Sequence, residues 1–442
     1  MQKLLILSLG VLALAQAASS AGVLNFKVHE KTLANGFRIL VVPMDSPGVV
    51  AYYTVVRSGS RNEPEPGRSG YAHFFEHILF RGTEKYPEPK YNGILKAMGA
   101  DSNAFTTDDF TCYHIVGPAS KLEVMFDIES DRFRNLQYSV ADFKKEAGAI
   151  LGEYRKSHSS PFLTLFETLQ DKAYTAHTYK HTTMGFLKDV QAMPDGFEYS
   201  REFFRRYYKP DNCVLIVTGD VVPEQVFALA QTYYDGWTGH SDPAAIAPEP
   251  PQAGPLSAHV DWPLPTLPYV VVAYHGPAFD PKSRENAALD VASQLLFSEA
   301  APFYQDLVVQ KQWADMLEGS WEFHRDPYLY VVIARAAVPD KAGEIQTLLM
   351  KALEDLKSAP IPEKRLADIK SNLKYSFLSR LNTADHVAGS LAYFVDLTGS
   401  WQAIDELYAT YDRLTADDIR QAAAKFFVPA NRTVVTLSQK EK

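Results

Sequence analysis

The sequence predicts an α+β protein with two homologous domains, each an α/β sandwich, related by a pseudo-two-fold axis. Three observations predict this fold class. β-rich runs alternate with helical stretches from Phe26 onward, an extended segment rich in Pro and Ala divides the chain, and the two parts that it separates end in similar sequences. The chain has 442 residues, which is more than one hydrophobic core usually supports, so the length favours two or three domains.

The first expected elements are two short strands and a helix. Residues 37–42 and 49–57 are β-rich runs, and the dipeptide Asn35-Gly36 before them is a strong turn signal. A second turn is expected over residues 45–48. The helix that follows carries His73, and its polar side chains are the main functional signal of the sequence.

The dividing segment sets the expected domain limits. Residues 239–257 show no hydrophobic periodicity and are rich in Pro and Ala, which predicts an extended linker. The first domain is therefore expected over residues 22–238 and the second over residues 258–442.

An internal duplication is predicted from the ends of the two domains. Residues 207–215 and 426–434 each contain an aromatic pair, a Pro and an Asn before an apolar run. In each copy the helix is expected to end near the aromatic pair, because Pro cannot continue it and sets the turn into a strand. The copies are about 200 residues long, whereas solenoid repeats are roughly 20 to 50 residues long.

The amino terminus has the pattern of a signal peptide. Lys3 precedes an apolar run over residues 4–15, which closes in Ala15-Gln16-Ala17. The run is about a dozen residues long, shorter than the roughly 20 that a membrane-spanning helix needs. We therefore expect residues 1–21 to be a cleavable signal peptide, the mature protein to be periplasmic or secreted, and no segment to span a membrane.

Charge and cysteine content exclude several classes of function. The formal net charge of −9 provides no electrostatic footprint for nucleic acid or for anionic membranes, since both need clustered Lys and Arg. The two cysteines, Cys112 and Cys213, are too few for a disulfide framework. One bridge between them stays open, but their strand-like surroundings favour buried free thiols.

The segment His73-Phe74-Phe75-Glu76-His77 predicts a zinc site. On a helix with 100° per residue, His73, Glu76 and His77 project from one arc of roughly 100°. Zinc favours His nitrogens completed by a carboxylate, and a catalytic site keeps one position for water. The spacing His-x-x-Glu-His is the inverted zincin pattern. The alternative is a partly buried helix whose histidines satisfy backbone carbonyls or carboxylates.

A second helical stretch supplies two further carboxylates. Glu146 and Glu153 lie seven residues apart on one helix face, a rise of about 10.5 Å, so they cannot readily share one ion. One is expected to be a ligand and the other to support the site or the fold. His177 and His181 also lie four residues apart, but no carboxylate lies between them, and we leave them out of the metal set.

At this point the sequence resembles the pitrilysin and insulinase family of zinc peptidases with the inverted motif, in its short branch typified by the mitochondrial processing peptidase. The resemblance rests on residues 70–83, on Asn103-Ala104-Phe105-Thr106 and on residues 146–154. It implies one half of a clam-shell endopeptidase that cleaves peptides or unfolded segments in a closed chamber. It also implies one Zn²⁺ per chain.

The resemblance assigns a role to each candidate site residue. It implies that zinc is held by His73, His77 and Glu153, with Glu76 as general base and Glu146 as a supporting carboxylate that orients a ligand. It further implies that Asn103, Ala104 and Phe105 lie on an exposed edge strand that pairs with the substrate backbone.

The carboxy-terminal half departs from the family pattern. The family commonly carries an Arg and a Tyr seven residues apart that stabilise the oxyanion, and Val308 and Asp315 occupy those places here. We therefore expect a heterodimer with a homologous subunit that supplies the Arg and Tyr. A homodimer of this chain is the less favoured alternative. Two alternatives stay open: a non-catalytic subunit that keeps the fold, and a small-molecule binding module with structural zinc. Structural zinc sites are usually closed and rich in Cys, which disfavours the second.

Overall fold

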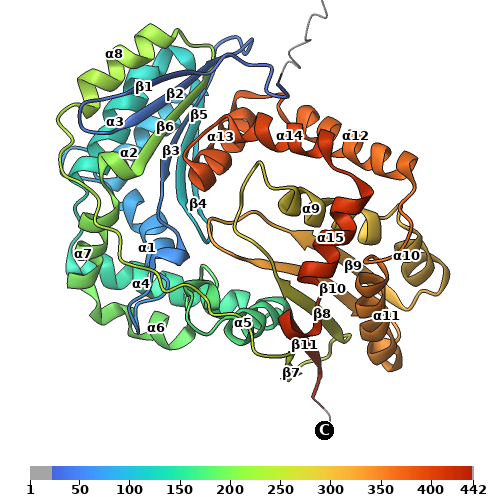
Figure 1. The fold of residues 1–442 in the computed structure, drawn as a ribbon. Helices are drawn as coiled ribbons and strands as arrows, with labels where there is room; N and C mark the ends of the chain where they lie inside the picture. The colour runs from blue at the N-terminus through green and yellow to red at the C-terminus, as the bar shows by residue number, and fades with distance from the viewer. Residues whose placement is uncertain (1–21, 441–442) are drawn as a thin grey trace, which may run out of the picture.

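The computed structural model describes residues 22–440, which form two domains side by side (Figure 1). The predicted signal peptide, residues 1–21, lies outside the described residues. Within residues 22–440 there are two β-sheets, one of six and one of five strands, and no helix long and apolar enough to cross a membrane. The predicted α+β class with duplicated domains is confirmed by this arrangement.

The first sheet contains the predicted early strands. Its spatial order is β1 (His29–Thr32), β2 (Arg38–Pro43), β6 (Cys213–Gly219), β3 (Val49–Val56), β5 (Thr111–Pro118) and β4 (Asp101–Thr106). Strands β2 and β6 are parallel, and the other neighbours are antiparallel. Every residue of β6 is buried, as expected of a central strand covered on both faces. Strand β4 is at the edge, where its outer side has no partner strand within the described residues.

The second sheet repeats the order of the first without an equivalent of β1. Its order is β7 (Leu256–Trp262), β11 (Arg432–Gln439), β8 (Tyr269–His275), β10 (Leu329–Ala336) and β9 (Ala314–Trp321). The parallel pair β7 and β11 corresponds to β2 and β6, and the remaining pairs are antiparallel in both sheets. This shared topology confirms the duplication.

The predicted turns before β6 and β11 are also alike in detail. Short 3₁₀ turns, Pro210–Asn212 and Pro429–Asn431, lead into the two strands. The Asn212 amide donates to the Tyr207 carbonyl at 2.9 Å, and the Asn431 amide donates to the Phe426 carbonyl at 3.1 Å. The Asn side chain thus caps the preceding helix in both copies.

Helices cover the sheets in each domain. Those of the first are α1 (Tyr71–Ile78), α2 (Glu88–Met98), α3 (Leu122–Asn135), α4 (Val140–Ser157), α5 (Pro161–Ala173), α6 (Leu187–Ala192), α7 (Phe197–Tyr207) and α8 (Pro223–Tyr234). Those of the second are α9 (Arg284–Phe297), α10 (Pro302–Tyr304), α11 (Ala342–Asp355), α12 (Glu363–Arg380), α13 (Ala384–Thr398), α14 (Ala403–Arg413) and α15 (Ala416–Phe426).

Each domain packs one helix against the sheet of the other domain. Helix α5 of the first domain packs on β7 and β11 of the second, and α13 of the second packs on β3 and β6 of the first (Figure 1). At the second contact, the Thr218 hydroxyl donates to the Ala384 carbonyl at 2.6 Å, and the Tyr53 hydroxyl donates to Asp385 at the same distance. The domains are therefore held by buried apolar surface and by hydrogen bonds.

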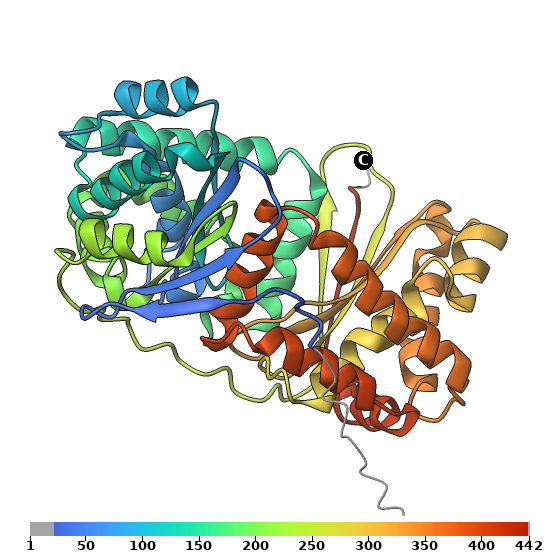
Figure 2. The same ribbon diagram turned by 90° about the horizontal axis from the view of Figure 1, so that it is seen from above.

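The predicted linker is an extended chain without helix or strand between α8 and β7 (Figure 2). Its Glu249 carboxylate accepts hydrogen bonds at 2.8 Å from the backbone N–H groups of Thr175, Ala176 and His177. Strand β7 begins at Leu256, two residues inside the predicted linker, because its backbone pairs with β11 from that residue onward. Cys112 and Cys213 are buried free thiols.

Candidate metal centre

Helix α1 carries three of the candidate site residues, and its start is fixed by a buried carboxylate. Gly70 precedes the helix with a φ of 91°, a left-handed conformation that glycine tolerates best. Glu63 accepts hydrogen bonds from the N–H groups of Gly70, at 2.7 Å, and Ala72, at 2.6 Å. These bonds satisfy backbone donors that a helix start leaves free.

The structure brings His73, His77 and Glu153 together. Glu153 Oε2, on helix α4, lies 3.7 Å from His73 Nε2 and 3.5 Å from His77 Nε2. Within residues 22–440, these three form the one group of His, Cys, Asp or Glu side chains whose ligand atoms converge as a metal site requires, all within 4.8 Å of one another. His73 is buried, whereas His77 and Glu153 are partly exposed, so the group opens to one side.

The donor set fits zinc in geometry and in chemistry. Ligand bonds of about 2.0 to 2.1 Å in a tetrahedral site separate neighbouring donors by about 3.4 Å, close to the two distances from Glu153 Oε2. Burial, and after it the neighbouring His77, lowers the pKa of His73 to about 4. A neutral imidazole is the form that binds a metal.

Glu146, the other carboxylate of α4, lies behind the donor group. It is buried, and its Oε2 lies 3.6 Å from His77 Nδ1, a little farther than a hydrogen bond. Its Oε1 accepts a hydrogen bond from Arg81, which also pairs with Glu88 at 2.5 Å. A carboxylate on the outer nitrogen of a ligating His fixes its tautomer and orientation. Arg81, which sequence reasoning gave no role, holds that carboxylate.

Glu76 points from α1 toward the edge strand β4. The Thr106 hydroxyl donates to Glu76 Oε2 at 2.7 Å. Burial raises the pKa of Glu76 above its ordinary value, Thr106 and His77 act in the opposite direction, and Glu153 adds to the rise. A carboxyl group whose pKa is raised toward neutrality is better matched to proton transfer.

The edge strand and the metal centre share one cavity. Asn103 and Phe105 are exposed on β4, and Ala104 between them is buried. A cavity of about 280 Å³ is lined by Glu76, His77, Arg81, Glu88, Asn103 and Glu146, and also by Phe80. A chain laid along β4 would therefore run past Glu76 and His77.

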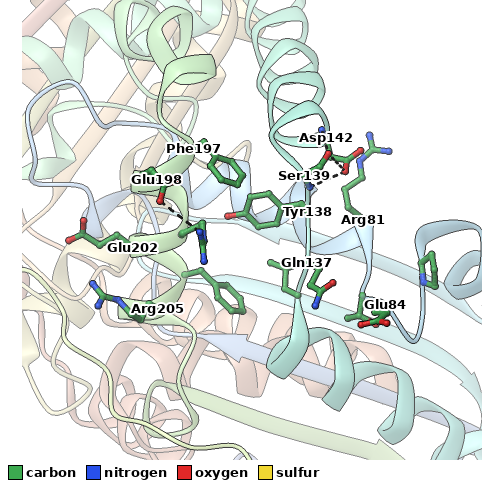
Figure 3. Close-up of a pocket in the computed structure, with 15 residues that line it drawn as sticks. Arg81, Glu84, Gln137, Tyr138, Ser139, Asp142, Phe197, Glu198, Glu202 and Arg205 are labelled. Carbon is green, nitrogen blue, oxygen red and sulfur yellow. Dashed lines mark hydrogen bonds and ion pairs between the residues drawn. The ribbon is translucent and has the colours of Figure 1, made fainter.

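A larger cavity of about 1170 Å³ also has Arg81 in its wall (Figure 3). Tyr138, Phe197 and Arg205 are among its lining residues, and so are Ser139 and Asp142, which cap the start of α4. None of His73, His77 and Glu153 lines it. Its wall is mixed in charge, and only Arg81 is shared with the cavity at the metal centre.

The second histidine pair serves other contacts. His177 Nε2 lies 2.9 Å from Asp326 Oδ2, within hydrogen-bond distance, and His181 Nε2 lies 3.8 Å from Glu63. These positions agree with leaving both residues out of the metal set.

Val308 and Asp315, which stand where the family has its Arg and Tyr, lie in the second domain. Val308 lies in a π-helical segment, Gln305–Gln310, and Asp315 lies on β9. Both oxygens of Asp315 accept hydrogen bonds from Arg335 on β10, at 2.8 and 2.9 Å. The register of β9 with β10 shifts beside Arg335, and this shift places Asp315 next to the Arg335 side chain. Sequence reasoning missed Arg335, which lies 20 residues beyond Asp315 and meets it only through strand pairing.

Comparisons with known protein families show which family the chain belongs to. Residues 43–186 match the family model described as "Insulinase (Peptidase family M16)", and residues 197–373 match the one described as "Peptidase M16 inactive domain". The chain belongs to the insulinase, or M16, peptidase family. The family resemblance of the sequence is thereby confirmed.

Individual M16 proteins resemble the chain over nearly all its length. "Zinc protease PqqE" of Helicobacter pylori is 29% identical over 416 residues, 92% of each chain. A crystal structure of a protease from Helicobacter pylori has a TM-score of 0.87 at 29% identity and covers 93% of this chain and all of that one. The structure of the periplasmic protease PqqL from Escherichia coli has a TM-score of 0.78 at 18% identity. It shares the fold over 94% of this chain but only 48% of its own, so this chain corresponds in fold to one half of it.

Proposed function

We propose that this M16 chain is a zinc-dependent endopeptidase that hydrolyses peptides or unfolded polypeptide segments. The observation that carries the proposal is the meeting of His73, His77 and Glu153 beside Glu76. These three would hold one Zn²⁺ per chain, within a first domain that we assign to residues 22–238. The second domain, residues 258–442, would carry no metal.

Each residue at the site has a task that its chemistry suits. Zinc, when bound, supplies a Lewis acid that lowers the pKa of a water molecule to about 7 and polarises a carbonyl. Glu76 accepts the proton of the attacking water and passes it to the leaving amine. One of its oxygens is engaged by Thr106, and the other accepts no hydrogen bond from a side chain of the described residues. Glu146 orients His77.

Substrate would bind along β4 as an added strand. An exposed edge offers unpaired backbone N–H and C=O groups, and pairing with them gives affinity that depends little on sequence. Asn103, Ala104 and Phe105 would form this contact beside the cavity that contains Glu76. Substrates would thus need an extended segment, as peptides and unfolded chains have.

We further propose that the active form is a heterodimer with a homologous subunit. The chain corresponds in fold to about half of the longer PqqL chain, so an assembly with a second M16 half would match the fold of that whole chain. Neither Val308 nor Asp315 can donate to an oxyanion, and the nearby Arg335 is engaged by Asp315. Oxyanion donors are worth about 10² to 10³ each in turnover, so a partner with Arg and Tyr is favoured over a second identical copy.

A periplasmic or secreted location completes the proposal. It is supported by the signal pattern of residues 1–21 and by a structural relative described as periplasmic. The test of the function is hydrolysis of a quenched fluorescent peptide library by the chain purified without residues 1–21. Activity should disappear on chelation and return with added zinc. Activity that survives complete metal removal would contradict the proposal.

The second candidate is a non-catalytic subunit that keeps the fold and the metal. It is favoured by Val308 and Asp315, which stand where the family has its Arg and Tyr donors. The two candidates separate when the chain is mixed with an M16 partner. If Glu76→Gln in this chain leaves the activity of the mixture unchanged, catalysis belongs to the partner.

A further inference from the structure

Thr106 connects the proposed general base to the end of the edge strand. It is the last residue of β4, and its hydroxyl is the side-chain donor that reaches Glu76 Oε2, at 2.7 Å. A carboxylate on a helix can rotate about its side-chain bonds, and a fixed donor on one oxygen restricts that rotation. The position of Glu76 therefore depends on where β4 ends.

The turn after Thr106 is tightly closed by its own hydrogen bonds. The N–H of Thr107 donates to the Phe110 carbonyl at 2.8 Å. The Thr107 hydroxyl oxygen accepts from the N–H groups of Asp109, at 3.2 Å, and Phe110, at 3.0 Å. These bonds make residues 107–110 a compact unit, so a displacement of the turn would also move Thr106.

The second domain contacts this turn through two adjacent carboxylates, which Ser60 and Tyr179 of the first domain also bind. His324 Nε2 lies 3.2 Å from Asp108 Oδ2, and the N–H of Arg325 donates to Asp109 Oδ2 at 3.1 Å. His324 is itself buried and stacked on Tyr328, with ring centroids 3.4 Å apart. The loop between β9 and β10 thus contacts the turn, and it belongs to the domain without the metal group.

We propose that Thr106 is a positioning residue for Glu76 and that the second domain, through His324 and the turn at Asp108, keeps Thr106 in place. The inference rests on the proposed function, because it assigns Glu76 as the base. It also gives the second domain a role in catalysis within the same chain, since the β9–β10 loop sets the end of the strand that orients the base.

The first arm of the test measures peptide hydrolysis. Thr106→Val keeps the shape of the side chain and removes the hydroxyl, whereas Thr106→Ser keeps the hydroxyl. We expect kcat to fall about 10-fold or more in Thr106→Val, with KM and zinc content unchanged, and to recover to within about 3-fold in Thr106→Ser. An unchanged kcat in Thr106→Val, or no recovery in Thr106→Ser, would overturn the proposal.

The second arm needs no activity and so separates this inference from the proposed function. In metal-free protein, the melting temperatures of Thr106→Val, Glu76→Ala and the double variant form a cycle that isolates their interaction. A shift in the double variant that differs from the sum of the single shifts supports the contact. Additive shifts would overturn it, whether or not the chain hydrolyses peptides.

The third arm tests the role of the second domain. His324→Phe keeps a ring that can stack on Tyr328 but removes the contact with Asp108. We expect faster hydrogen–deuterium exchange in residues 101–110, a lower kcat, and no further fall when Thr106→Val is added. Unchanged exchange in residues 101–110, or a full additional fall in the double variant, would show that the second domain does not act through Thr106.

Discussion

His77 Nε2 lies 3.5 Å from Glu153 Oε2, although the two residues are 76 positions apart in the sequence. The contact joins helices α1 and α4 at the group formed by His73, His77 and Glu153. Helix α1 packs against α4 through buried apolar side chains such as Phe74 and Phe143, whose ring centroids are 4.9 Å apart. The packing of these two helices therefore brings the three donors together.

The first prediction concerns the three ligands. His77→Ala and Glu153→Gln should each lose zinc during gel filtration, because two remaining protein ligands hold the ion poorly. Metal content by mass spectrometry measures this loss. His158→Ala is the matched control, since His158 ends α4 outside the metal group and should keep about one zinc per chain. Full zinc occupancy in both ligand variants would remove these residues from the site.

The second prediction concerns Arg81. Arg81→Met removes the charge that pairs with buried Glu146, so Glu146 should orient His77 less well. Loss of such outer partners typically weakens metal affinity about 10- to 100-fold. Competition with a chromogenic chelator measures the affinity. Arg81→Lys restores the charge and should recover part of the loss. Equal affinities in Arg81→Met and the unaltered protein would show that Glu146 needs no partner.

The third prediction is a pH dependence at the contact between the domains. Burial alone would lower the pKa of His324, but Asp108, Asp109 and Glu322 together raise it above its ordinary value. A raised pKa in the folded state means that the stabilisation is fully present below the ordinary value of about 6.5 and is lost as pH rises through the folded value.

Denaturant unfolding from pH 6 to pH 9 checks this expectation. The free energy of unfolding should exceed that of His324→Gln most at pH 6, and the difference should shrink as the pH rises. A difference that grows with pH would mean that His324 is neutral in the folded protein.

The fourth prediction concerns the missing oxyanion donors. The double variant Val308→Arg, Asp315→Tyr restores the family residues and also frees Arg335 from its ion pair. If two copies of the chain can assemble, the double variant alone should hydrolyse peptides about 10²-fold faster than the unaltered chain alone. Initial rates on one fluorogenic peptide provide the comparison. A fast unaltered chain in a preparation free of any second subunit would contradict the heterodimer.

The sequence predicts the parts of the site that depend on helical periodicity. His73, Glu76 and His77 share a helix face because of their spacing, and the rise between Glu146 and Glu153 separates their roles. The paired turns at Asn212 and Asn431 are equally local, which is why the duplication is visible in the sequence.

Contacts between distant elements could not be read from the sequence. Arg81 meets Glu146 only because α4 lies against the end of α1, and Arg335 meets Asp315 through strand register. The contact of His324 with Asp108 crosses the two domains. No periodicity links such pairs, so only the folded chain shows the partners of Arg81, Arg335 and His324.

The fifth prediction is that Glu76 acts as the base of a zinc peptidase. Glu76→Gln preserves the shape of the side chain but cannot accept a proton, and loss of a general base typically costs about 10² to 10⁴-fold in rate. The deciding measurement is the turnover of one fluorogenic peptide by zinc-loaded unaltered protein and by zinc-loaded Glu76→Gln, each with its metal content determined. We expect equal zinc and a loss of at least about 10²-fold in the variant; equal turnover at equal zinc content would show that Glu76 is not the base.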